Sequence, residues 1–151
     1  MIQTRTPGPH DLRLIRLWWE QRRHYSPPAE ILSPYAVIAR DESPTDGGSQ
    51  ALAAGFLYPC KDTPVAHIHW LVSNPMAGAL DRARALRSVV LSLEEIAGDM
   101  GHPFIFTATD NTQLAELGTR HAGYTVASPQ SFIPLFKYLD PTLDPACNLP
   151  L

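Results

Sequence analysis

The chain has 151 residues, 44% of them hydrophobic, and a formal net charge of −3 at pH 7. That length is typical of one domain with one substantial core, and the net negative charge argues against non-specific nucleic-acid binding. No apolar run approaches the roughly 18 residues of a membrane-spanning helix, and no secretory signal is visible. The two cysteines, Cys60 and Cys147, lie far apart without metal-ligand spacing. We therefore expect a cytoplasmic domain with reduced thiols and no membrane partner.

The first seventy or so residues predict a meander with one helix. Residues 2–6 form a candidate first strand that ends at Pro7-Gly8-Pro9. Apolar residues at three- and four-residue steps predict a helix over 11–24, with Asp11 at its positive end. β-Rich runs separated by short loops, which favour antiparallel hairpins, predict three further strands. These strands cover residues 35–40, 51–58 and 65–72.

Basic residues gather on two predicted helices. The first cluster contains Arg13, Arg16, Arg22 and Arg23, and the second contains Arg82, Arg84 and Arg87. Charged residues on one side of a helix are typical of a solvated face, so the simplest interpretation of both clusters is exposure to water. They give no strong nucleic-acid signal in a chain of net negative charge.

The run from Val65 to Tyr124 reads strand, loop, helix, strand, helix. An apolar stripe predicts a long helix from Leu80 or Asp81 to Ala97, and residues 104–107 form a short buried strand. Two parallel strands bridged by a helix need this spacing. In such a unit, the loop after the first strand and the start of the helix often bind anions or cofactors.

The rest of the chain adds a helix, two strands and a tail. Asp110 with Gln113 resembles a capping box for a helix over 112–121, and strands are predicted over 123–126 and 132–139. Pro134 lacks the N–H that a ladder needs, so we expect a bulge or an edge there. The fold class is α/β of the mixed α+β kind: a mainly antiparallel sheet of six to seven strands, flanked by about four helices. Residues 1–139 form the domain, and 140–151 an irregular tail.

This order of elements resembles the GNAT superfamily of acyl-CoA-dependent N-acyltransferases, over nearly the whole chain up to Leu139. Three places carry the resemblance: residues 70–75, residues 93–97 and the segment 111–124. The last is similar to the family's stretch of Asn, two Leu, a basic residue and Gly-(Phe/Tyr), here Asn111, Leu114, Leu117, Arg120, Gly123 and Tyr124. The resemblance implies transfer of an acetyl or other acyl group from acyl-CoA to an amine, by direct attack in a ternary complex.

The family's phosphate loop reads (Arg/Gln)-x-x-Gly-x-(Gly/Ala), and the matching residues are Gly78, Asp81 and Ala83. Ala83 fits, whereas Gly78 replaces the basic or amide residue. Asp81 brings a carboxylate toward the expected phosphates, so the loop is degraded. The resemblance still implies acetyl-CoA or another acyl-CoA as co-substrate. The residues expected to hold it are Leu71, Val72, Ser73, Gly78, Ala79, Arg82, Ala83 and Asn111.

His67 and His69 flank Ile68, so both side chains point to one face of the strand. In the family this strand borders the acceptor site and often supplies the general base, a task that suits histidine near neutral pH. We expect His69, nearer the strand's carboxyl end, to be the base, with His67 as the alternative. The pair can instead be structural, hydrogen-bonded histidines. We expect no metal, because no third ligand has a suitable spacing.

Two further features bear on activity. The family often protonates the leaving thiolate with a tyrosine, but residues 117–121 contain none. Either Thr119 or His121 acts in its place, or the thiolate leaves without help from the protein. Trp18 and Trp19 lie on the helix that lines the acceptor side in this family. One can lie in the core while the other reaches the cleft, but core positions for both are the preferred interpretation.

A second class of function stays open. The degraded loop and the missing tyrosine favour a catalytically inactive GNAT-like fold that binds a protein or assists an assembly. Short divergent chains of this kind resemble some that bacteriophages encode. For the enzyme, the expected partner is a small-molecule or protein amine, and a homodimer is one candidate for the oligomeric state.

Overall fold

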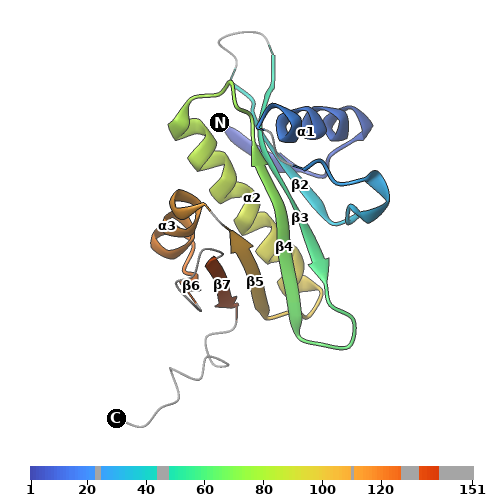
Figure 1. The fold of residues 1–151 in the computed structure, drawn as a ribbon, viewed down its shortest axis with the longest axis vertical. Coiled ribbons are helices and arrows are strands. Elements are labelled where there is room, and N and C mark those ends of the chain that lie inside the picture. The colour runs from blue at the N-terminus through green and yellow to red at the C-terminus, as the bar shows by residue number, and fades with distance from the viewer. Residues whose placement is uncertain (23–24, 44–47, 110, 127–132, 140–151) are drawn as a thin grey trace.

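The computed structural model of the chain describes residues 1–22, 25–43, 48–109, 111–126 and 133–139. These residues form one sheet of seven strands, in the order β1-β2-β3-β4-β5-β7-β6 (Figure 1). Neighbouring strands are antiparallel, except that β4 and β5 are parallel. This confirms the predicted sheet. The strands are β1 (Ile2–Arg5), β2 (Ala36–Asp41), β3 (Gln50–Pro59), β4 (Val65–Ser73), β5 (Phe104–Thr109), β6 (Thr125–Val126) and β7 (Ile133–Tyr138).

The described part of the chain contains three α-helices and one short 3-10 helix. They are α1 (Pro9–Gln21), the 3-10 helix η1 (Ala29–Ile31), α2 (Ala79–Asp99) and α3 (Thr112–His121). α1 lies on one side of the sheet, and α2 and α3 lie on the other (Figure 1). None of the helices described is long and apolar enough to cross a membrane.

α2 covers the face of the sheet that holds the larger core. Its fully buried residues Ala85, Val89, Leu93 and Ala97 recur every four positions and form one stripe. The stripe packs with residues of the sheet such as Leu57 of β3. Complete burial of a Val or Leu side chain contributes about 1.5–3 kcal/mol. The apolar spacing that predicted this helix therefore also holds it against the sheet.

α1 covers the opposite face. Ile15, Trp18 and Trp19 are 0%, 2% and 3% exposed and form a second core with Ile38 and Phe56. Both tryptophans are therefore core residues. The second core fixes the C-terminal end of α1 against β3 and β4.

A charge network fixes the start of α1. The buried Asp11 carboxylate accepts a hydrogen bond from the Gly8 N–H at 2.9 Å and pairs with Arg5 at 2.8 Å and Arg40 at 3.0 Å. Burial alone would raise the pKa of Asp11, but the Gly8 hydrogen bond and the two arginines outweigh it, and the pKa lies below its usual value. The carboxylate thus joins β1, α1 and β2.

Two local predictions differ from the structure. The N-cap of α3 is Asn111, whose side chain accepts hydrogen bonds from the N–H groups of Gln113 and Leu114, whereas Asp110 lies outside the described residues. The bulge expected at Pro134 is absent, whereas the edge expected there stays a prediction, because the described pairing of β6 with β7 reaches only Leu135 and Phe136. β7 is an inner strand whose pairing with β5 continues without a register shift. Arg23, His24 and the tail predicted for 140–151 also lie outside the described residues.

Candidate functional site

The site begins with a bulge in β4. The register runs from Ala54 opposite Val72 to Phe56 opposite His69. One residue of β3, Gly55, therefore faces two residues of β4, Trp70 and Leu71. Trp70 has φ 55°, a left-handed backbone conformation that is uncommon for a bulky residue. Such bulges bend a strand and redirect its backbone groups and side chains.

Gly55 makes the bulge compatible with the core. A Cβ atom at position 55 would lie 2.6 Å from Leu71 Cδ2 and 3.0 Å from Val89 Cγ1. Real Cβ atoms do not approach carbon so closely, so any larger residue would displace Leu71 or α2. The glycine lets the bulged segment of β4 pack directly against β3.

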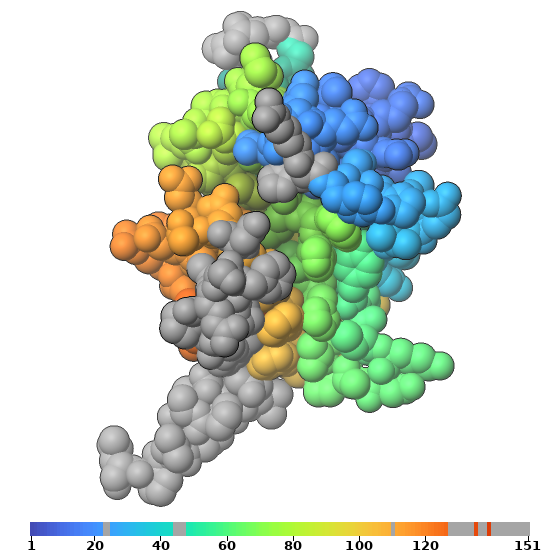
Figure 2. Space-filling model, viewed as in Figure 1, coloured from blue at the N-terminus to red at the C-terminus, as the bar shows by residue number. Residues whose placement is uncertain are grey.

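Around the bulge, β4 is no longer paired with β5. Their parallel pairing ends at His67 opposite Phe106, although β4 continues to Ser73 and β5 to Thr109. A cavity of about 510 Å³ opens where the strands diverge. In the space-filling view, β4 (green) reaches the surface between the α1 region (blue) and α3 (orange) (Figure 2). Specific small-molecule sites commonly have such volumes.

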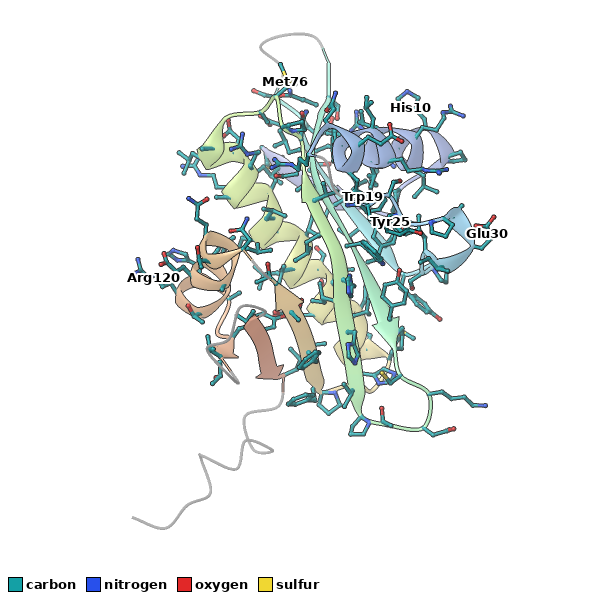
Figure 3. The ribbon with its side chains drawn as sticks, viewed as in Figure 1. His10, Trp19, Tyr25, Glu30, Met76 and Arg120 are labelled. Carbon is teal, nitrogen blue, oxygen red and sulfur yellow. The ribbon has the colours of Figure 1, made fainter. Side chains whose placement is uncertain are left out.

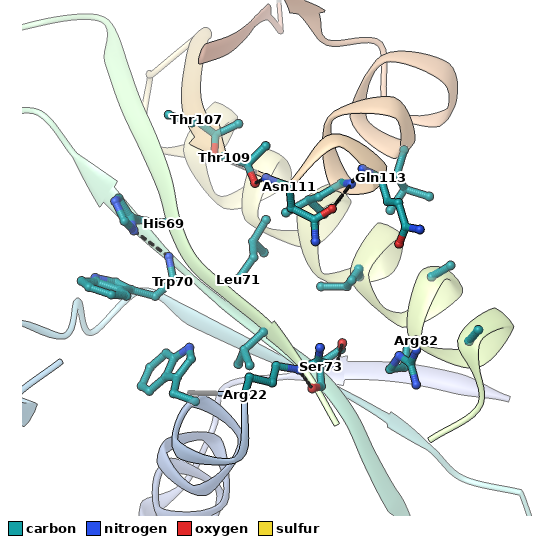
Figure 4. Close-up of a pocket in the computed structure, with 18 of the residues that line it drawn as sticks. Arg22, His69, Trp70, Leu71, Ser73, Arg82, Thr107, Thr109, Asn111 and Gln113 are labelled. Atoms are coloured by element: carbon teal, nitrogen blue, oxygen red, sulfur yellow. Dashed lines mark hydrogen bonds between the residues drawn. The ribbon is translucent and has the colours of Figure 1, made fainter. Parts of the chain in front are cut away.

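Four walls enclose the cavity (Figure 4). The first is β4 from His69 to Ser73, and the second is β5 from Thr107 to Thr109. The third comes from α1 and the segment after it, and the fourth from the N-terminal turns of α2 and α3. The third and fourth walls consist of Trp19, Arg22, Tyr25, Ala79, Arg82, Ala83, Leu86, Asn111, Gln113, Leu114 and Leu117.

One end of the cavity is aromatic. The Trp70 ring lies 6.0 Å from Trp19, 6.3 Å from Tyr25 and 4.7 Å from the imidazole of His69, measured between ring centroids. Trp19 and Tyr25 lie on the α1 side of β4 (Figure 3). Trp19 thus belongs to the second core and also lines the cavity. The core position and the cleft position, which the sequence left as alternatives, are both occupied by this one residue. This wall can hold an apolar group or a cation.

His69 lies at the aromatic end. Its Nδ1 accepts a hydrogen bond from the backbone N–H of Trp70 at 2.8 Å. A neutral imidazole that accepts at Nδ1 carries its proton on Nε2. Partial removal from water, together with the charge of nearby His67, lowers the pKa of His69 below its usual value. The His67 ring packs against Phe106 in a tilted arrangement, with centroids 5.1 Å apart, and does not line the cavity.

The other end of the cavity is cationic. Arg22 donates from Nε to the carbonyl oxygen of Ser73 at 3.1 Å and from Nη2 to the Ser73 hydroxyl at 3.0 Å. Arg82 of α2 donates to the carbonyl oxygen of Ala77. Burial and the charge of Arg82 lower the pKa of Arg22, yet a guanidinium stays protonated in proteins. None of the described residues that line the cavity is acidic.

The start of α2 shows how the altered phosphate loop is arranged. Gly78 is the N-cap and Asp81 lies in the first turn. Asp81 Oδ2 lies 3.1 Å from the point that a Cβ on Gly78 would occupy, so the carboxylate folds back over the cap. Both residues are exposed, and neither lines the cavity. Asp81 therefore meets the positive end of the helix from outside the cleft.

α3 contributes its first turns to the cavity. Asn111 caps the helix through Oδ1, at 3.0 Å from the Gln113 nitrogen and 3.2 Å from the Leu114 nitrogen. Thr119 and His121, farther along, do not line the cavity. Tyr124 is buried beside Glu94. Burial, which is the larger cause, and the negative charge of Glu94 raise the pKa of Tyr124 far above the usual range. That pKa makes Tyr124 a poor proton donor.

The structure brings most of the predicted site residues together. His69, Leu71, Val72, Ser73, Ala79, Arg82, Ala83 and Asn111 line the cavity, whereas His67 and Gly78 do not. Sequence reasoning missed Arg22, because its place on a helix indicated a solvated face. It also missed Tyr25, Trp70 and the end of β5. Because the carboxyl ends of neighbouring parallel strands flank a common cleft, that rule would have found residues 107–109.

Comparisons with known proteins identify the fold. No family model matches the sequence, and neither does a curated protein. N-acetylglutamate synthase from Neisseria gonorrhoeae, crystallised with coenzyme A and L-arginine, matches with TM-score 0.69 and 16% identity. That match covers 91% of this chain, which spans only 33% of the synthase chain.

Two shorter proteins match over almost their whole length. One is yncA from Salmonella typhimurium, a candidate acetyltransferase solved with acetyl-CoA, with TM-score 0.70, 12% identity and coverage of 95% of this chain and 97% of that one. The other is a GCN5-related N-acetyltransferase from Kribbella flavida, with TM-score 0.65, 18% identity and coverage of 91% and 98%. These likenesses show that the chain has the GNAT fold.

Among the described residues, no group of three or more His, Cys, Asp or Glu side chains is placed to hold a metal ion. The polar side chains in the cavity are instead those of Arg, His, Ser, Thr, Asn, Gln and the ring groups of Trp and Tyr. These groups recognise ligands through hydrogen bonds, charge and stacking.

The packing around Gly55 predicts the effect of one added methyl group. Gly55→Ala should lower the free energy of unfolding by about 1–3 kcal/mol, because Leu71 must move from the bulge. Gly98→Ala in α2 is the matched control: its nearest atom would be 3.9 Å away, and alanine favours a helix by up to about 1 kcal/mol. Urea denaturation measures both. Equal stability of the two variants would show that the bulge is loosely packed.

Proposed function

We propose that this chain transfers an acyl group from acyl-CoA to an amine. The observation that carries the proposal is the cleft between the diverging ends of β4 and β5, opened by the bulge at Trp70 and Leu71. It joins an aromatic end, suited to an acceptor, with a cationic end, suited to phosphates. Solved structures with this fold include proteins bound to CoA or acetyl-CoA, which supports the same type of co-substrate here.

The walls of the cleft suggest how acyl-CoA lies. Successive N–H groups along a strand point to opposite edges. The Asn74 N–H bonds to Leu52 of β3, so that of Val72 also faces β3. The N–H groups of Leu71 and Ser73, on the edge that β5 leaves, are the proposed donors for the carbonyls of the co-substrate. Ala79 and Ala83 present small side chains along the first turns of α2, so an extended chain can approach the helix closely. Arg82 lies where the phosphates would be, at the positive end of α2. Asn111 closes the opposite side from α3.

His69 is the base in this proposal. Its lowered pKa keeps the ring neutral at neutral pH, as a base must be. The lone pair on its Nδ1 accepts a hydrogen bond from the backbone N–H of Trp70 at the bulge. When that N–H turns to the thioester oxygen, Nδ1 becomes available to take the proton of the attacking amine. One backbone rotation would thus polarise the carbonyl and release the base together.

The aromatic end limits the acceptor. Trp19, Tyr25 and Trp70 offer ring faces, and none of the described residues there is a carboxylate that could bind a second positive charge. An amine that carries an apolar or planar group fits this wall better than a long polyamine. The amine must reach His69 in its neutral form to attack the thioester.

A second candidate is a GNAT-like fold that binds a protein without catalysis. The observation that favours it is the altered phosphate loop, with Gly78 as N-cap and the Asp81 carboxylate folded over the positive end of α2. From outside the cavity, a carboxylate at that place weakens the attraction of the helix terminus for an anion. Titration with acyl-CoA separates the two candidates.

The first test measures binding and turnover together. At about 100 times its dissociation constant, acetyl-CoA should stabilise the fold by about 2.7 kcal/mol, which raises the unfolding temperature by several degrees for a chain of this size. Release of free CoA with a panel of amines then measures transfer. Without a thermal shift from millimolar acetyl-CoA, CoA or longer acyl-CoAs, the protein-binding candidate replaces the enzyme.

The second test concerns His69. His69→Asn keeps an acceptor near the position of Nδ1 but cannot take a proton, so turnover should fall by about 10²–10⁴ while acetyl-CoA affinity holds. In the wild type, the rate should fall as pH drops through the His69 pKa, below the unperturbed 6.5, because the protonated ring cannot act as base. This acid limb should be missing in His69→Asn.

His67→Asn is the comparison variant. Loss of its charge should raise the pKa of His69 and move the acid limb to higher pH, with turnover at pH 8 retained. Full turnover in His69→Asn, together with a large loss in His67→Asn, would exchange the two roles.

A further inference from the structure

Two guanidinium groups from different elements point into the same end of the cavity. Arg22 comes from the residue that follows α1, and Arg82 from the first turn of α2, 60 positions later in the chain. Figure 4 shows them on either side of the end of β4. Exposed arginines normally turn apart into water, where their repulsion is small. These two are held in place by backbone oxygens of Ser73 and Ala77.

The surroundings of the pair are unbalanced in charge. The described residues that line the cavity include no carboxylate to neutralise either arginine. The two groups are close enough for Arg82 to lower the pKa of Arg22. Bringing like charges together at a partly desolvated wall is unfavourable unless an anion joins them. A cavity of about 510 Å³ is next to the pair and can admit such an anion.

Arg22 retains donors for a ligand. A guanidinium has five N–H groups in a planar fork, and among the described residues its hydrogen bonds are the two to Ser73. Those bonds fix the guanidinium of a residue that lines the cavity, and its other N–H groups remain available to a ligand there. A preorganised fork suits the oxygens of a phosphate better than a flexible ammonium does.

We infer that Arg22 is a diphosphate-binding residue that acts together with Arg82 from the opposite wall of the cleft. It supplies, from α1, the cation that the loop lacks where Gly78 stands. The ligand chemistry is a diphosphate ester. That the diphosphate belongs to acyl-CoA rests on the proposed function. Asp81 does not prevent this binding, because its carboxylate lies outside the cavity.

The test compares two glutamine variants with two matched controls. Arg22→Gln and Arg82→Gln each remove one cavity cation. Arg16→Gln and Arg84→Gln remove the same charge from exposed positions of the same two helical segments, neither of which lines the cavity. Calorimetry with acetyl-CoA should show a roughly tenfold to hundredfold weaker affinity for the cavity variants and a change within about twofold for the controls.

Three probes identify the group that is recognised. S-acetylpantetheine, which lacks the diphosphate, should bind the wild type and Arg22→Gln equally. Inorganic pyrophosphate should protect the wild type and Arg16→Gln against thermal unfolding, and it should protect Arg22→Gln much less. Arg22→Lys keeps the charge but loses the fork, and its acetyl-CoA affinity should lie between those of the wild type and Arg22→Gln. The unfolding temperature without ligand verifies that each variant is folded.

The outcomes separate this inference from the proposed function. Equal acetyl-CoA affinity in folded Arg22→Gln and wild type overturns the inference, whether or not the chain is an acyltransferase. If Arg22→Gln weakens the binding of S-acetylpantetheine as much as that of acetyl-CoA, the inference is also overturned. Arg22 would then shape the cleft and not bind the phosphates. Pyrophosphate protection that depends on Arg22, in a chain that does not bind acetyl-CoA, upholds the inference and rejects the proposed function.

Discussion

The packing of Gly55 against the bulge of β4 is the constraint on which the rest of the structure depends. Trp70 and Leu71 together occupy the space opposite one glycine, and Trp70 takes a left-handed conformation to do so. The pairing of β4 with β5 ends at His67 and Phe106, just before the bulge, although β4 runs six residues farther and β5 three. Without the bulge, backbone N–H groups at the end of β4 would bond to β5. With it, they face a cleft.

The bulge also sets the chemistry at the two ends of that cleft. At one end it places the Trp70 N–H on His69, so the donor for a carbonyl and the acceptor for a proton are joined by one hydrogen bond. At the other end it carries Ser73 to Arg22, which fixes a guanidinium beside Arg82. Histidine and arginine sites that seem independent in the sequence therefore share one backbone feature. A change at Gly55 should disturb both.

The sequence was sufficient for elements whose pattern is local. The bounds of α3 agree with those predicted, the long helix and the parallel crossover are present, and β4 ends one residue later than expected. The bulge was not predictable, because it arises from the pairing register between β3 and β4. No residue type at these positions is specific for a bulge. Arg22 was missed for a related reason. Helical periodicity predicts which residues share one side of a helix, but only the tertiary arrangement shows that Arg22 contacts the end of β4. At the start of α3, Asp110 and Asn111 are adjacent and equally able to cap, so a one-residue error was unavoidable.

The most direct test of the account follows backbone amide resonances during a titration with acetyl-CoA. If acyl-CoA binds as proposed, its acyl-bearing arm lies in the cleft beside the bulge. The amide signals of Trp70, Leu71 and Val72 should therefore shift together with those of residues 107–109, and the Trp70 signal should report the loss of its bond to His69. Saturable shifts that leave β4 and the end of β5 unchanged, and appear elsewhere on the sheet, would contradict the account.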